Sequence, residues 1–132
     1  MKNYLLLLLL LVSQNNFAQE TIKESQDDLV VDYSVIDVKP DYPGGIKLLF
    51  VIFKTNYKAP DKEGLKGKVV VNYIIEKDGS MSNMKVIEDV GYGSGEEAIR
   101  VLKKCLNWKP GIHNGKIVRT SHQFKLNIET SG

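Results

Sequence analysis

The sequence predicts a small α+β domain, in which an antiparallel sheet is covered on one face by two helices. Two stretches alternate apolar and polar residues around an Asp-Gly pair, a third alternates near the end of the chain, and two others show helical spacing of apolar residues. The order of these stretches is strand, helix, strand, strand, helix, strand. That order is expected of a β-α-β-β-α-β domain with both helices packed on one face of the sheet.

The N-terminal residues predict export. A lysine precedes the unbroken apolar run 5–12, a polar stretch follows it, and the small residue Ala18 comes next. As a helix this run reaches roughly 12 Å, whereas the hydrocarbon core of a bilayer is about 30 Å thick. We therefore expect a signal peptide at residues 1–18, a flexible lead-in at residues 19–28, and a single domain at residues 29–132.

The first half of the domain is predicted to contain one strand and one helix. Apolar and polar residues alternate over residues 29–38, and a break in the alternation at Ile36 suggests a bulge. Pro43 suits the first turn of a helix over residues 44–57, because its missing N–H would have no partner there. This helix is apolar nearly all round, so we expect it either to be covered on several sides or to present an apolar patch.

A hairpin and a long final strand are the clearest predictions. The β-rich runs 69–76 and 80–90 flank Asp78-Gly79, and glycine accepts the positive φ that a tight hairpin turn needs. The run 118–129 alternates without a break, with apolar residues and His122 on one face and polar residues on the other.

The second helix is predicted to begin at Ser94. Glu97 follows three residues later, so the two side chains are expected to form a capping box, and the helix should end before Trp108. The residues at helical spacing that should face the core are Ala98, Val101, Leu102 and Cys105.

The residues offer little for catalysis, metal binding or nucleic-acid binding. The net charge is only +2, with both signs interspersed, so no broad basic face for nucleic acid is predicted. His113 lies in a glycine-flanked turn, and neither it nor His122 has a Cys, Asp or Glu at metal-ligand spacing. The glycine-rich run 91–95 lacks the lysine of a phosphate loop. We therefore predict a protein that is not an enzyme and that binds no metal or cofactor.

Several short motifs occur together in one order along the chain. They are Tyr42-Pro43-Gly44-Gly45, Gly67 with Val69 and Val71, Asp78-Gly79, Trp108-Lys109-Pro110-Gly111, Gly115 with Val118, and the alternating strand that contains Phe124. Over about residues 38–128, this succession resembles the C-terminal domain of TonB energy transducers.

The resemblance implies a periplasmic domain that binds another protein. TonB C-terminal domains recognise the TonB box of outer-membrane receptors by adding it as a strand to a sheet edge, as part of TonB-dependent transport. The final strand is the candidate edge, and its polar face gives the predicted partner-binding residues Arg119, Ser121, Gln123, Lys125 and Asn127. A merely solvated face is the alternative for these residues, and the sequence leaves homodimer formation open.

The N-terminal residues 1–28 decide whether such a protein could transmit energy. A TonB transducer also has an inner-membrane helix and a long proline-rich spacer. The lead-in 19–28 contains no proline and extends over at most roughly 35 Å. The first hypothesis is therefore an exported TonB-like binding domain without energy coupling. The alternative is a true energy transducer that an uncleaved N-terminal anchor retains in the inner membrane.

Overall fold

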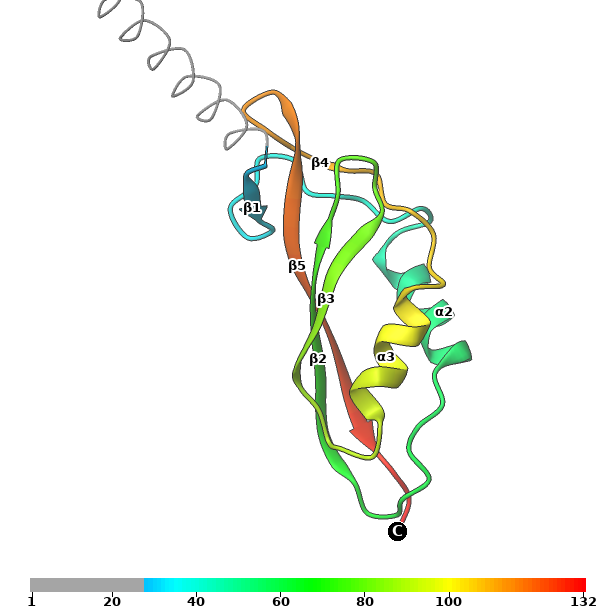
Figure 1. Ribbon diagram of the computed structural model, residues 1–132. Coiled ribbons are helices and arrows are strands. Elements are labelled where there is room, and N and C mark those ends of the chain that lie inside the picture. Colours follow the sequence, from blue (N-terminus) through cyan, green and yellow to red (C-terminus); the bar gives the residue numbers. More distant parts are fainter. Residues whose placement is uncertain (1–27) are drawn as a thin grey trace, which may run out of the picture.

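A computed structural model describes residues 28–132 and contains a twisted sheet with two helices against one face (Figure 1). The predicted signal peptide and almost all of the lead-in lie outside the described residues. The elements are β1 (Val30–Asp32), α2 (Ile46–Asn56), β2 (Lys66–Ile75), β3 (Met81–Glu88), α3 (Ser94–Leu102), β4 (Gly111–His113) and β5 (Lys116–Glu129). This arrangement confirms the predicted α+β class.

The centre of the sheet is antiparallel, as predicted. The strand order is β1-β5-β2-β3, and β2 pairs with β5 in one continuous register from Lys66 opposite Glu129 to Ile75 opposite Thr120. The β2–β3 hairpin closes through a turn at Gly79, where φ is 85°. The β2–β3 pairing is less regular, with register shifts and a positive φ of 48° at Asn83. The outer strand β3 therefore presents an irregular edge.

The first strand is much shorter than predicted, and it is parallel to its neighbour. Only Val30–Asp32 is a strand, paired parallel with Arg119 to Ser121 of β5. The prediction of a strand over residues 29–38 was wrong because Asp32 starts a turn. Its carboxylate accepts hydrogen bonds from both the backbone N–H and the hydroxyl of Ser34. This local side-chain bonding competes with the ladder and bends the chain away from the sheet.

Two further details differ from the sequence predictions. The capping box does not form: the N-cap is Gly93 in the left-handed conformation, and Ser94 is the first helical residue. Its hydroxyl accepts a hydrogen bond from the N–H of Val90, while the Glu97 carboxylate binds Arg100 within the same helix. The short strand β4 was not predicted at all. It pairs with the start of β5 across a tight turn.

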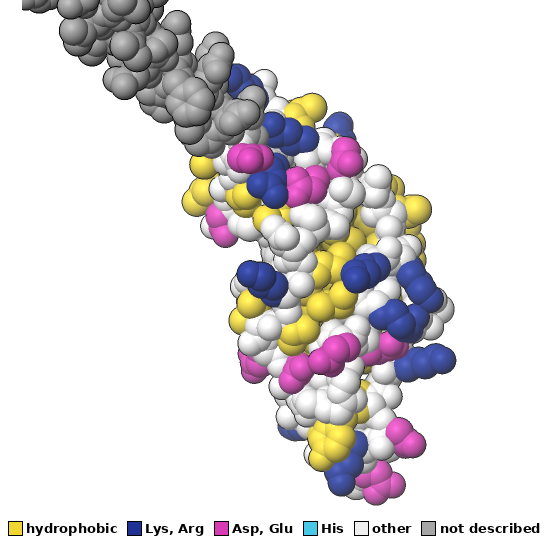
Figure 2. Space-filling view, viewed as in Figure 1, with side chains coloured by type: hydrophobic (Ala, Val, Ile, Leu, Met, Phe, Trp, Pro, Cys, Tyr) yellow, Lys and Arg dark blue, Asp and Glu magenta, His cyan; other side chains and the backbone are white. Residues whose placement is uncertain are grey.

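The hydrophobic core lies between the sheet and the helices. The β2 side chains that face the helices are fully buried, and Trp108 closes the core at the end near the hairpin turn. Helix α2 lies over β5, because Phe53 packs 4.4 Å from Phe124 between ring centroids and Phe50 stacks on the same ring at 5.0 Å. The outer side of α2 remains exposed, with Val51 60% accessible, so this helix does present an apolar patch. Figure 2 shows further apolar side chains interspersed with charged ones over the visible face.

Candidate functional site

Strand β5 is an edge of the sheet over its second half. One side pairs with β2 from Thr120 to Glu129 and with β4 at residues 116–118. On the other side, β1 pairs with residues 119–121. Within residues 28–132, no strand pairs with that side of residues 123–129. The second half of the longest strand is therefore open to an additional strand; we call residues 123–129 the open edge.

Two hydrogen bonds establish which backbone groups point outward along the open edge. The N–H of Thr130 donates to the carbonyl of Leu65 at 2.9 Å, so the even-numbered residues of β5 bond towards β2. The carbonyl of Ser121 accepts from the N–H of Tyr33 at 2.9 Å, so the odd-numbered residues bond towards β1. By this alternation, the N–H and C=O groups of the odd-numbered residues 123–129 point away from the sheet.

The five predicted partner-binding residues divide into two groups. Gln123, Lys125 and Asn127 have exposed side chains and lie on the open edge. Arg119 and Ser121 lie where β1 already covers the strand. Together, these positions show that the predicted edge is open at three of the five residues.

The side chains of Arg119 and Ser121 are engaged within the molecule. Arg119 forms a two-pronged pair with the carboxylate of Glu76, at 2.8 and 3.0 Å, and both side chains are no more than a quarter exposed. This arginine holds the pKa of Glu76 below its usual value through hydrogen bonds. The hydroxyl of Ser121 lies 3.4 Å from a carboxylate oxygen of Asp32.

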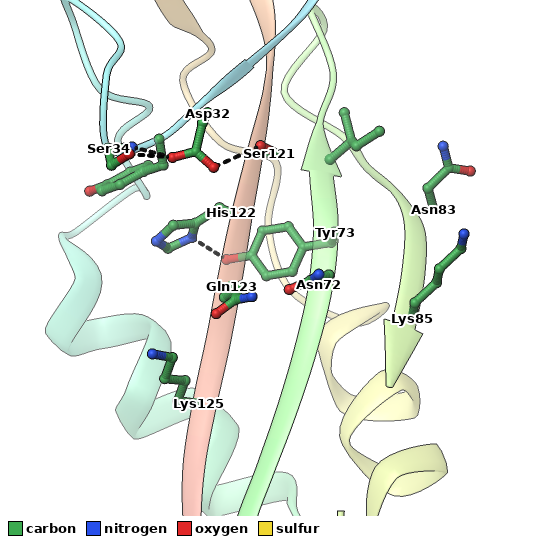
Figure 3. A pocket seen from close by; sticks show the side chains of 12 residues that line it. Asp32, Ser34, Asn72, Tyr73, Asn83, Lys85, Ser121, His122, Gln123 and Lys125 are labelled. Carbon is green, nitrogen blue, oxygen red and sulfur yellow. Dashed lines mark hydrogen bonds between the residues drawn. The ribbon is translucent and has the colours of Figure 1, made fainter. Parts of the chain in front are cut away.

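His122 lies beside the start of the open edge and is part of an aromatic cluster (Figure 3). A hydrogen bond of 2.6 Å joins the hydroxyl of Tyr73 and Nδ1 of His122, and the ring of Tyr33 packs 4.0 Å from the imidazole between centroids. Burial lowers the pKa of His122 and raises that of Tyr73, so the imidazole is neutral and the phenol keeps its proton. The cluster anchors the turn after β1 against β5 and so fixes where the open edge begins.

A polar groove of about 560 Å³ lies beside β1, on the sheet face away from the helices (Figure 3). Its lining includes Asn72, Lys85, Gln123 and Lys125. The side-chain oxygen of Asn72 is buried and accepts no hydrogen bond from the described residues.

Comparison with known families identifies the domain. Residues 58–129 match the family described as the Gram-negative bacterial TonB protein C-terminal. The chain belongs to this family. The match covers β2, β3, α3, β4 and β5, and it therefore includes the whole open edge. No curated protein matches the chain.

Membership defines the general role of this TonB C-terminal domain. The family is concerned with TonB-associated transport in the Gram-negative envelope and with protein interaction, and it is not an enzyme family. Within the described residues, no group of three or more His, Cys, Asp and Glu side chains is arranged to hold a metal ion. None of the helices in that part of the chain is long and apolar enough to cross a bilayer.

A second hollow adjoins the open edge of the TonB C-terminal domain, and no pattern in the sequence pointed to it. It encloses about 200 Å³ between the last turn of α2 and the end of β5. Its walls include Phe53 from α2, Tyr57 at the C-cap of that helix, and Leu126 and Ile128 from the strand. These residues are far apart in sequence, so only the fold brings them together beside residues 123–129; we call this hollow the α2–β5 pocket.

Proposed function

We propose that this TonB C-terminal domain binds an extended segment of a partner protein as an additional strand on the open edge. The observation that carries the proposal is the row of outward backbone groups at residues 123–129, which have no partner strand among residues 28–132. Each backbone hydrogen bond contributes about 0.5–1.5 kcal/mol net, so a ladder of several such bonds gives useful affinity.

The open edge suits this role better than the opposite edge of the sheet. Strand β5 pairs with β2 in an unbroken register, which holds its outward groups in a regular row. The other edge, β3, has register shifts and a positive φ at Asn83. A bulged edge of this kind discourages further pairing.

The partner that we propose is the N-terminal TonB box segment of a TonB-dependent outer-membrane receptor. Family membership supports this choice, because the family takes part in TonB-associated transport. We also propose that residues 1–18 are removed on export and that the domain works in the periplasm.

Titration by NMR with receptor N-terminal peptides from the same host tests the proposal. We expect the largest amide shifts at the odd-numbered residues from Gln123 to Glu129. A matched pair of variants separates backbone from side chain at the centre of this edge. Lys125→Pro removes an outward N–H and should abolish binding, whereas Lys125→Thr retains that N–H and should bind nearly as well as the original protein.

A peptide control avoids any change to the protein. N-methylation of those peptide amides that face β5 removes donors while leaving the peptide side chains in place. Binding should then be lost. Undiminished binding of the N-methylated peptide, or shifts confined to residues outside the open edge, would refute strand addition.

A further inference from the structure

The α2–β5 pocket has fixed apolar walls. Phe53 is fully buried, Leu126 and Ile128 are less than a tenth exposed, and Phe53 stacks on Tyr57 with 5.1 Å between ring centroids. The hydroxyl of Tyr57 donates to the carbonyl of Ser94 at 2.9 Å, so this side chain is tied to α3. The pocket is therefore held open by residues that other contacts keep in place.

The pocket is continuous with the open edge. Its lining contains the core-facing residues Leu126 and Ile128 together with Asn127 and Glu129, whose backbone groups point outward. Because the pocket is lined by core-facing residues and by residues whose backbone groups point outward, it lies directly beside β5. A strand that pairs with the open edge must therefore pass directly over the mouth of the pocket.

Strand geometry then determines which side chains of an added strand enter the pocket. Successive side chains of a strand point to opposite faces of the sheet. A partner residue opposite Leu126 or Ile128 points to the helix side and meets the α2–β5 pocket. A partner residue opposite Gln123 or Lys125 points to the other face, over the polar groove.

Resting on the strand addition proposed above, we propose that the α2–β5 pocket accepts one aliphatic side chain of the incoming segment and thereby fixes its register on β5. The positions of that segment opposite Gln123 and Lys125 are polar, because they lie over the polar groove. The partner is therefore an extended segment that combines an aliphatic residue with polar ones, rather than a uniformly apolar strand.

Host–guest peptides test this inference. The probes are nine-residue threonine and serine peptides with lysine at each end, capped at both termini, with either Leu or Ala at the central position. Threonine favours the extended conformation in both probes. Burial of the larger side chain in a pocket open on one side should make the Leu peptide bind about tenfold more tightly than the Ala peptide. NOEs should connect the Leu methyl groups of the peptide to those of Ile128.

Ala59 provides a matched pair of protein variants. It lines the pocket from the exposed loop after α2, so substitutions there leave the core unchanged. Ala59→Phe fills the pocket and should remove the preference for Leu, while Ala59→Ser should retain it. Both variants should still show peptide-induced amide shifts along residues 123–129.

The outcomes separate this inference from the proposed function. If both peptides shift the amides of residues 123–129 but bind equally, the aliphatic pocket is refuted and strand addition stands. If neither peptide, nor any receptor peptide, perturbs the open edge, strand addition fails and this inference fails with it. NOEs from the Leu methyl groups to residues outside the pocket would also overturn the inference.

Discussion

Substitution of Gly79 by alanine should destabilise the domain strongly, because two independent costs coincide in the hairpin turn. The residue has φ of 85°, a left-handed conformation that costs an L-residue about 1–2 kcal/mol. A Cβ atom there would lie 1.9 Å from the backbone oxygen of Trp108, so the turn must move. That movement weakens the hydrogen bond from the N–H of Trp108 to the carbonyl of Gly79, which is worth about 1 kcal/mol.

The expected loss in the free energy of unfolding is about 2–3 kcal/mol, which corresponds to roughly 10–20 °C in Tm for a domain of this size. Urea denaturation followed by circular dichroism measures it. Gly115→Ala is the matched control, since Gly115 also has a positive φ of 73° but no atom lies within 4 Å of its Cβ position. It should cost only about 1–2 kcal/mol. Equal losses in the two variants would refute the steric part of the reasoning.

Three further predictions concern pH, the ion pair and export. The pKa of His122 is lowered in the folded state relative to the value of about 6.5 in the unfolded chain. The free energy that this difference adds to folding is therefore fully present above about pH 6.5 and is lost as the pH falls below that value. His122→Leu should therefore reduce the loss of stability between pH 7.5 and pH 5, and an unchanged loss by urea denaturation would contradict this. Arg119→Ala breaks the ion pair with Glu76 and should lower the free energy of unfolding by about 1–2 kcal/mol. It should not change the affinity for the peptide. Weaker peptide binding in the NMR titration would instead show that Arg119 contacts the partner. Mass spectrometry of the protein from its host should find an N-terminus at Gln19, whereas an intact Met1 in the membrane fraction would indicate an uncleaved anchor.

The features that the sequence predicted well are determined by local pattern. The alternation over residues 118–129 and the Asp78-Gly79 pair specify a strand and a hairpin with little help from the rest of the chain. The strand β4 could have been found in the same way, because Asn114-Gly115 is a strong hairpin signal and lies directly before β5.

The features that the sequence did not predict depend on side-chain hydrogen bonds that compete with regular backbone structure, or on contacts between distant parts of the chain. The Asp32 carboxylate bonds to Ser34 in a turn, which ends a strand that alternation alone would continue. Glu97 is paired with Arg100 and so is not available for a capping box. Whether a given part of β5 is an edge depends on where β1 lies, and β1 pairs with residues almost ninety positions later in the chain. Local pattern contains no information about that pairing.

The turn that follows β1 limits the length of strand that the domain offers to a partner. At one end of the open edge, the N–H of Tyr33 donates to the carbonyl of Ser121 and its ring packs against His122. At the other end, β5 itself ends at Glu129. Between these two limits lie the seven residues 123–129, or about 23 Å of strand. A partner segment longer than this has no more backbone to pair with. Affinity should consequently rise with peptide length up to about seven residues and then level off.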